Sequence, residues 1–210
     1  TNLRLTGLVD TDYVLQFSDG TRSVTSNALQ LSAAGAASIQ LLNVPAADRT
    51  GDLLTVQPSL RLLDFDGNLA VSTSVTVTAT VTGGGYIESG TTSSAVDGGF
   101  VTFSSLVLVA PIGVPQQLTF TATTASGSFA VSTTTALVVR HTDTAYFEVL
   151  APVVAGNFQQ GAVLATQPKL QAFDRYGNPA TSDNSTVVTA SIGAGSLGAI
   201  SGSATAQASG

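Results

Sequence analysis

The stretch QPSLRLLDFDGN (57–68) returns 110 positions later as QPKLQAFDRYGN (167–178). In both copies a short apolar run leads into Asp-x-x-Gly-Asn. This ending is typical of a tight turn, because Asp and Asn bond back to nearby backbone groups and Gly supplies a positive φ. Similarity at a fixed spacing is the sequence signature of a repeat architecture. The pair therefore predicts at least two copies of one strand-and-turn unit.

Other segments match at nearly the same spacing on both sides of this pair. The matching pairs are VTATV (77–81) with VTASI (188–192), SIQLLNVPA (38–46) with YFEVLAPVV (146–154), LQF (15–17) with LTF (118–120), and VTSNALQL (24–31) with VSTTTALVV (131–139). Offsets from 103 to 112 predict one repeat of roughly 105–110 residues with small loop insertions.

The phase of the repeat divides the chain into three parts. Residues 37–143 contain one complete unit, residues 1–36 match the C-terminal part of another, and residues 144–210 match the N-terminal part of a further one. Two interpretations follow: the chain is a window from a long tandem array, or its two partial ends complete each other between subunits. Because the chain does not begin with Met, we expect a mature or excised piece.

The complete unit alternates strand-like runs with turn residues at the spacing of a β-sandwich. VTVTATV (75–81) alternates strictly, which indicates a strand with one buried face. We predict an all-β fold of tandem Greek-key β-sandwiches, joined by the short linkers LSAAGAAS (31–38) and RHTDTA (140–145), with adjacent units nearly end to end. The predicted strands are 38–44, 53–64 with a bend at Pro58, 74–82, 86–96, 100–109, 116–124 and 128–139.

The composition narrows the classes of function. The chain has no Cys, which excludes a disulfide scaffold and Cys-based zinc or redox chemistry. Its net charge is −6 and Lys169 is its only lysine, so binding to nucleic acid is not expected, because such binding requires cations to neutralise phosphates. No apolar run approaches the roughly 18 residues of a membrane-spanning helix.

The order of motifs supports a family resemblance. The complete unit contains five motifs in a fixed order: Asp-x-x-Gly-Asn, VTxT/A, a Gly-rich turn, GFVTFSSLVL (99–108) and LTFTATTASG (118–127). This order resembles the bacterial immunoglobulin-like repeats of invasin- and intimin-like adhesins and related giant surface proteins. The resemblance implies an extracellular or bacterial cell-surface location, with neighbouring repeats or identical subunits as end-to-end partners and a host or surface ligand left open.

Three functions fit these observations. The favoured one is a non-enzymatic structural segment of a long bacterial fibre or adhesin stalk. The second is a self-assembling filament subunit in which residues 1–31 complete the partial sandwich 144–210 of a neighbour. The third is a module that binds carbohydrate or protein through loops at one end of a sandwich. No convergent catalytic set is present in the sequence, so we do not expect an enzyme.

Four aspartates are the candidate metal ligands. Asp64 and Asp66 could begin a calcium loop, since carboxylates at alternating positions are the oxygen ligands that calcium prefers. The second copy has Tyr176 in place of Asp66, which favours a tight turn instead. Asp48 and Asp52, near the unit boundary, could join a calcium site between units. Apart from this calcium site, we expect no cofactor.

Two further motifs favour a structural interpretation. GAGSLG (193–198) has the spacing of a dinucleotide-binding loop, but no helix pattern and no acidic residue follow it, so we predict a turn between strands. His141 and Asp143 lie in a linker without a nucleophile elbow, and we predict that they are exposed and do not form a catalytic triad.

Overall fold

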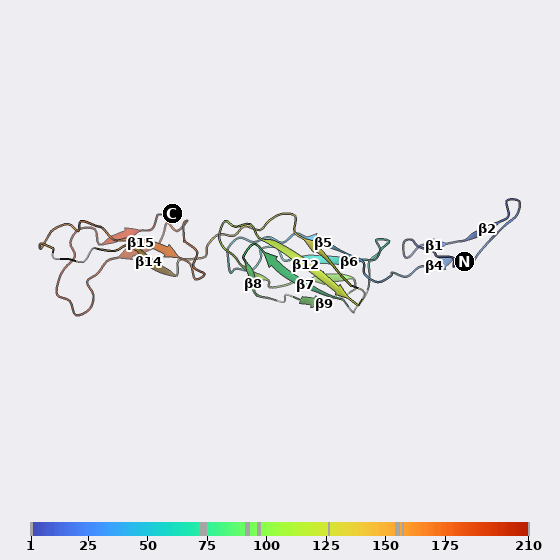
Figure 1. Cartoon of the computed structure of the whole chain (residues 1–210), viewed down its shortest axis with the longest axis horizontal. Helices are drawn as coiled ribbons and strands as arrows, with labels where there is room; N and C mark the ends of the chain where they lie inside the picture. The colour runs from blue at the N-terminus through green and yellow to red at the C-terminus, as the bar shows by residue number, and fades with distance from the viewer. Residues whose placement is uncertain are drawn as a thin grey trace.

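A computed structural model describes residues 2–71, 75–90, 93–95, 98–125, 127–153, 156 and 158–209, with only the backbone described at 93–95. These residues form strands and loops and contain no helix, so they contain none that is long and apolar enough to cross a membrane. The molecule is elongated, with three groups of strands in a row (Figure 1). The all-β prediction is confirmed.

The middle group consists of two antiparallel sheets and a short two-stranded ribbon. The first sheet has the order β10 (Phe100–Thr102), β6 (Ser59–Leu63), β5 (Ser38–Asn43). The second has the order β13 (Gly127–Ser132), β12 (Gln117–Thr124), β7 (Thr76–Thr82), β9 (Ser93–Ala95). The ribbon pairs β8 (Tyr86–Ser89) with β11 (Val107–Val109).

The two sheets share one apolar core, because alternate side chains of each strand point inward. Leu60 on β6 and Val77 on β7 are fully buried in the same cluster. The fully buried rings of Phe103 and Phe120 contact each other in this cluster, with their centroids 5.4 Å apart and their planes tilted by 46°. This core extends from Ile39 to Val139 along the sequence.

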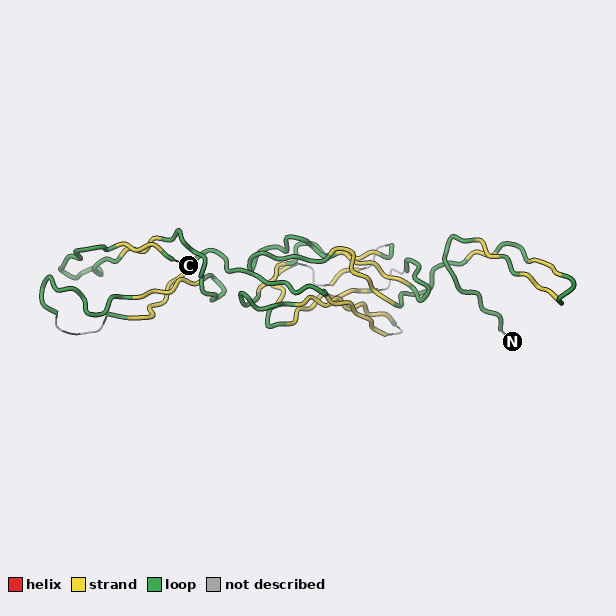
Figure 2. Tube along the Cα trace, turned by 90° about the horizontal axis from the view of Figure 1, so that it is seen from above, coloured by secondary structure: helices red, strands yellow, loops and turns green. Residues whose placement is uncertain are grey.

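The outer groups are smaller and consist of paired strands (Figure 2). The N-terminal strands are β1 (Asp12–Tyr13), β2 (Gln16–Ser18), β3 (Ser23–Thr25) and β4 (Leu29–Gln30), with β1 on β4 and β2 on β3. The C-terminal strands are β14 (Tyr146–Ala151), β15 (Lys169–Phe173), β16 (Val187–Thr189) and β17 (Thr205–Gln207), with β14 on β15 and β16 on β17.

Strand register reproduces the repeat that the sequence suggests. On β14 and β15, Phe147 lies opposite Ala172, and on β5 and β6 their sequence counterparts, Ile39 and Leu62, also lie opposite each other. Both ladders show an irregularity in register at the same relative place, between Val149 and Ala151 in the later copy. The matching residues therefore form the same local structure.

Several predicted strand boundaries are wrong. The strand expected at 53–64 begins only at Ser59, because Pro58 cannot donate to a ladder. The run 100–109 is two strands in different sheets, separated at Ser105, whose φ is 60°. The run 128–139 ends as a strand at Ser132 and continues as irregular chain.

The remaining differences are smaller. The run 86–96 holds two strands with different partners, and residues 91, 92 and 96 lie outside the described part of the chain. The run predicted at 74–82 is a strand from Thr76, with residue 74 also outside the described part.

Candidate functional site

Each Asp-x-x-Gly-Asn turn binds the linker that precedes it. In the turn 174–178, one carboxylate oxygen of Asp174 accepts the backbone N–H of Tyr176 and of Asn178, both at 2.9 Å. Its other oxygen accepts the backbone N–H of Thr142, in the linker, at 3.2 Å. One side chain therefore closes the turn and fixes the linker. We call this region, linker 140–145 with turn 174–178, the second junction.

The first junction, linker 31–38 with turn 64–68, has the same arrangement. One oxygen of Asp64 accepts the N–H of Asp66 at 3.0 Å and of Asn68 at 2.8 Å. Its other oxygen accepts the N–H of Ala34 at 3.1 Å. Asp64 and Asp174 are both buried, so their charges depend on these donors rather than on water. The repeated Asp is thus a linker-binding residue.

Hydrogen bonds determine the ionisation of both aspartates. Burial alone would raise the pKa of Asp64, but the bonds donated by Asn68 and Ala34 outweigh it, so the pKa lies below its ordinary value of 3.8. The pKa of Asp174 is also lowered, with burial opposed first by the backbone N–H of Asn178. Both carboxylates are therefore ionised in the folded chain at neutral pH.

The lowered pKa values of Asp64 and Asp174 predict how the stability of the folded chain depends on pH. A carboxyl whose pKa is lower when folded contributes stability above its unfolded pKa, and that stability is lost as the pH falls through the folded pKa. We expect the melting temperature to be nearly flat down to about pH 5 and to fall below about pH 4. Circular dichroism melting curves across this range measure it.

The control for this pH prediction is Asp64→Asn, which removes one of the carboxyls whose pKa is lowered in the folded chain. The variant should melt at a lower temperature near neutral pH and lose less stability on acidification than the parent chain. An equal loss on acidification in both proteins would contradict the assignment to Asp64.

The turns also contact the preceding group of strands. At the first junction, the side-chain oxygen of Asn68 accepts the N–H of Val9 at 2.9 Å. The side-chain nitrogen of Asn68 donates to the carbonyl of Gly7 at 3.0 Å. One amide therefore links the middle group to the N-terminal group.

At the second junction two different side chains make this contact. The hydroxyl of Tyr176 donates to the carboxylate of Glu88 at 2.8 Å, and the guanidinium of Arg175 donates to the carbonyl of Gly51 at 3.2 Å. The guanidinium also lies over the Tyr176 ring, 4.6 Å from its centre, in a cation–π contact. The tyrosine hydroxyl lies 2.1 Å from where a Cβ on residue 51 would be, so the contact requires the glycine.

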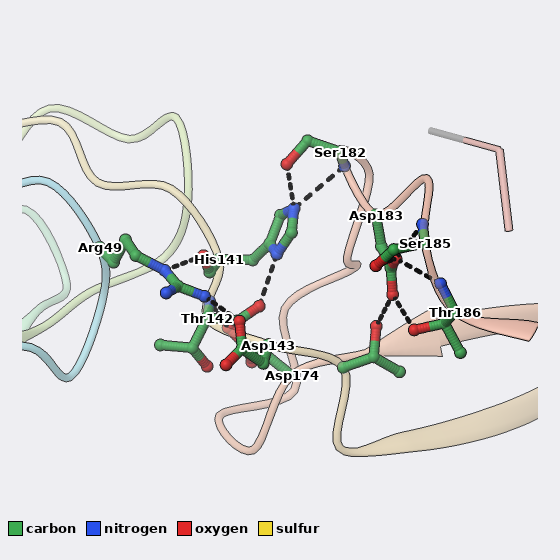
Figure 3. Close-up of polar contacts among 10 residues, drawn as sticks. Arg49, His141, Thr142, Asp143, Asp174, Ser182, Asp183, Ser185 and Thr186 are labelled. Atoms are coloured by element: carbon green, nitrogen blue, oxygen red, sulfur yellow. Dashed lines mark hydrogen bonds and ion pairs between the residues drawn. The ribbon is translucent and has the colours of Figure 1, made fainter.

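His141 connects the second linker to the loop after the turn (Figure 3). Its Nε2 lies 2.6 Å from the Ser182 hydroxyl and accepts the Ser182 N–H at 3.0 Å, while Nδ1 lies 2.6 Å from the Thr142 carbonyl. A backbone N–H only donates and a carbonyl only accepts, so the neutral tautomer with its proton on Nδ1 satisfies both contacts. His141 is half-buried, which corrects the prediction that it is exposed.

Asp143, the other residue of the predicted exposed pair, does lie exposed and forms an ion pair with Arg49 at 2.5 Å. A hydrolytic triad needs a carboxylate on Nδ1 of the histidine, but here that nitrogen faces a carbonyl and the nearest linker carboxylate faces an arginine. The contacts of His141 and Asp143 therefore serve to hold the linker between two groups of strands.

Asp183 anchors the loop beside this linker. Its carboxylate accepts the hydroxyls of Thr144 and Thr186, both at 2.5 Å, and the N–H groups of Ser185 and Thr186 at 2.9 and 3.0 Å. These bonds, the Thr144 hydroxyl first, hold the pKa of Asp183 far below its ordinary value. Around them lies a cleft of about 590 Å³, whose lining includes Arg49, Arg140, His141, Asp143, Ser182 and Asp183.

The four candidate calcium ligands lie in different surroundings. Asp48 forms an ion pair with Arg140, and Asp64 is surrounded by N–H donors. Asp66 is exposed, and the backbone N–H of Asp52 donates to the Arg49 carbonyl. Within the described part of the chain, no three His, Cys, Asp or Glu side chains are grouped so that they could hold a metal ion. The calcium site stays a prediction.

Sequence reasoning found the turns but missed their bonds to the linkers. Asp64 and Asp174 follow Ala34 and Thr142 by 30 and 32 positions, and only a structure shows which backbone group faces the second carboxylate oxygen. Ser182 and Asp183 lie outside the matching segments of the repeat, so the sequence comparison did not single them out.

Comparison with known proteins adds no relative. No protein-family model matches the chain. A search of curated proteins finds none with a matching sequence.

Proposed function

We propose that this chain is a non-enzymatic structural segment of an extracellular bacterial fibre or stalk, in which immunoglobulin-like sandwiches follow one another end to end. The observation that carries the proposal is the repeated linker bond, from Ala34 to Asp64 and from Thr142 to Asp174. A chain whose linkers are held in the same way at successive junctions stays extended and resists bending, which suits a stalk or fibre.

The strand order supports the immunoglobulin-like part of the proposal. In that fold the strands A, B and E share one sheet, and C, F and G share the other. Taking β5 as strand A, the sheet β5-β6-β10 has the order A-B-E, and the strands β7-β12-β13 of the second sheet have the order C-F-G, with β9 as a further strand on the edge of β7. The resemblance of the motifs to surface repeats points to the same fold.

The composition suits an exposed fibre. The chain has no Cys and no Met, the side chains that are most readily oxidised outside the cell.

Polar contacts at each junction, such as Asn68 with Gly7 and Tyr176 with Glu88, add to the linker bonds. A junction fixed on two sides of the linker resists bending more than the linker alone.

Small-angle X-ray scattering of the dilute 210-residue chain tests the structural part of the proposal. We expect the profile of a single elongated body with the three groups in line. A compact profile, or one that needs an ensemble of bent conformations, would overturn it. Antibody labelling of intact source cells tests the location, and labelling that requires broken cells would overturn an extracellular role.

A further inference from the structure

The two linkers differ in one ionisable side chain. His141 is the only histidine of the chain, and it lies in the linker of the second junction. Histidine is the side chain that ordinarily changes its charge between pH 5 and 8. The linker of the first junction, LSAAGAAS (31–38), holds no ionisable side chain and has Ala33 at the position that corresponds to His141. A group that titrates in this range is therefore present in the second linker and absent from the first.

The ring of His141 joins the linker to the loop 181–186 of the C-terminal group (Figure 3). Its Nδ1 faces the Thr142 carbonyl at 2.6 Å, and a carbonyl only accepts, so the single ring proton of the neutral form lies on Nδ1. Nε2 is then free to accept the backbone N–H of Ser182 at 3.0 Å. The bond from the ring to the loop thus depends on the neutral form.

Protonation changes what the ring can bind. It places a second N–H on the ring, at Nε2. The Ser182 hydroxyl, 2.6 Å away, can turn its oxygen to accept this proton, but the Ser182 backbone N–H cannot. Two donors then face each other, and the backbone N–H loses its partner. The charged ring therefore holds the loop less well than the neutral ring does.

Two arginines lie beside the ring in the cleft of about 590 Å³. Arg49 comes from the middle group, where it pairs with Asp143 at 2.5 Å and donates from Nε to the backbone carbonyl of His141 at 3.3 Å. Arg140 precedes the ring in the linker and pairs with Asp48. A protonated ring adds a third cation to this lining, while both of these carboxylates are already paired.

Two carboxylates of the C-terminal group complete the surroundings of the linker. Asp183 already accepts two threonine hydroxyls and two backbone N–H groups. Asp174 accepts from its own turn and from the backbone of Thr142. Within the described part of the chain, the ring nitrogens of His141 contact a carbonyl and Ser182, and no carboxylate. A positive charge on the ring is therefore not offset by direct contact with a carboxylate.

We propose that His141 is a pH-sensitive switch of the second junction: the neutral ring binds the loop 181–186 to the linker, and protonation releases it. Lowering the pH favours the state that binds more protons, which is the released one. The bond from Thr142 to Asp174 persists, because hydrogen bonds keep the pKa of that carboxyl low. The junction is therefore fixed at pH 7.5 and bends more freely at pH 5, while the linker stays attached to its turn.

This inference rests on the proposed function, in which the junction is a fixed joint, and adds regulation of that joint. The switch acts on a contact between two groups of strands and leaves the core of the middle group intact. The melting temperature of that core should therefore stay nearly flat over the same range of pH.

Hydrogen exchange of the full chain, resolved by NMR, tests the bond itself. We expect the protection factor of the Ser182 amide, corrected for the intrinsic effect of pH, to fall by about 2- to 12-fold between pH 7.5 and pH 5, as the loss of one hydrogen bond implies. The Ala34 amide, which is bound at the first junction, should keep its protection. Equal protection of Ser182 at both pH values would overturn the inference.

Two variants assign the pH dependence to the ring. Gln in His141→Gln has an oxygen that accepts but does not titrate in this range, and His141→Ala removes the side chain. The pH dependence of Ser182 protection should vanish in both variants. A dependence as large as in the parent chain would show that another group is responsible.

Distances between spin labels test the effect on the junction. Labels at Thr78→Cys on β7 and Glu148→Cys on β14 should give a narrow distribution at pH 7.5 and a broader one at pH 5. The control pair, Ser23→Cys on β3 with Thr78→Cys, spans the first junction and should give the same distribution at both pH values. A narrow distribution across the second junction at both pH values overturns the switch and leaves the proposed function standing. A broad distribution already at pH 7.5 overturns both.

Discussion

Replacing Phe120 with alanine is expected to lower the free energy of unfolding of the middle group by about 3–5 kcal/mol. The side chain is fully buried between the two sheets and its ring contacts that of Phe103. Removing it leaves a cavity in the apolar core that these sheets share. Urea unfolding of the dilute chain, followed by circular dichroism, measures the loss.

Phe17→Ala is the matched control, because it makes the same substitution at the same position of the repeat. Phe17 is 54% exposed in the single chain, so its removal should change the unfolding of the middle group by less than about 0.5 kcal/mol. Equal destabilisation by the two substitutions would contradict the assignment of Phe120 to a closed core and of Phe17 to an uncovered hairpin.

Replacing Asp174 with asparagine is expected to speed hydrogen exchange at the Thr142 amide by about 10- to 150-fold. This is the fold-change that corresponds to losing a hydrogen bond to a charged acceptor, roughly 1.5–3 kcal/mol. The carboxylate accepts from the turn with one oxygen and from Thr142 with the other, and an amide side chain cannot accept at both positions. Exchange resolved by NMR measures the change residue by residue.

Asp66→Asn is the control for the second prediction. It removes the same charge from the other Asp-x-x-Gly-Asn turn, but Asp66 is exposed and lies at the position of Tyr176 rather than of the linker-binding Asp. Exchange at Thr142 and at Ala34 should be unchanged. Faster exchange at Thr142 in this variant, or unchanged exchange in Asp174→Asn, would show that the linker is held by other contacts.

The repeat made much of the fold predictable. Matching of SIQLLNVPA (38–46) with YFEVLAPVV (146–154) predicted the same unit in both copies, and the two ladders indeed have equal register. Register follows the pattern of apolar and polar residues, because a shift by one residue would turn the buried face to solvent. The break in the run 100–109 could not be foreseen, since it depends on a positive φ at Ser105, a residue that rarely adopts one. Local sequence patterns predict where strands lie better than they predict where the chain passes from one sheet to another.

The candidate site was predictable only in part. The turns follow from local preferences of Asp, Gly and Asn, so sequence alone located Asp64 and Asp174. The linker bonds to these residues join groups about 30 positions apart, and no local pattern specifies them. The contact of His141 with Ser182 is likewise not specified by a local pattern, because it depends on how two groups of strands meet.

The central claim is that successive units are fixed to one another at the linker. Pulsed electron–electron distance measurement tests it most directly, with spin labels at Thr78→Cys on β7 and Glu148→Cys on β14, both exposed, and the labelled chain diluted with unlabelled chain. We predict one narrow distance distribution that broadens in Asp174→Asn. A broad distribution in the parent chain would contradict the claim, because it would show that the units reorient freely about the linker.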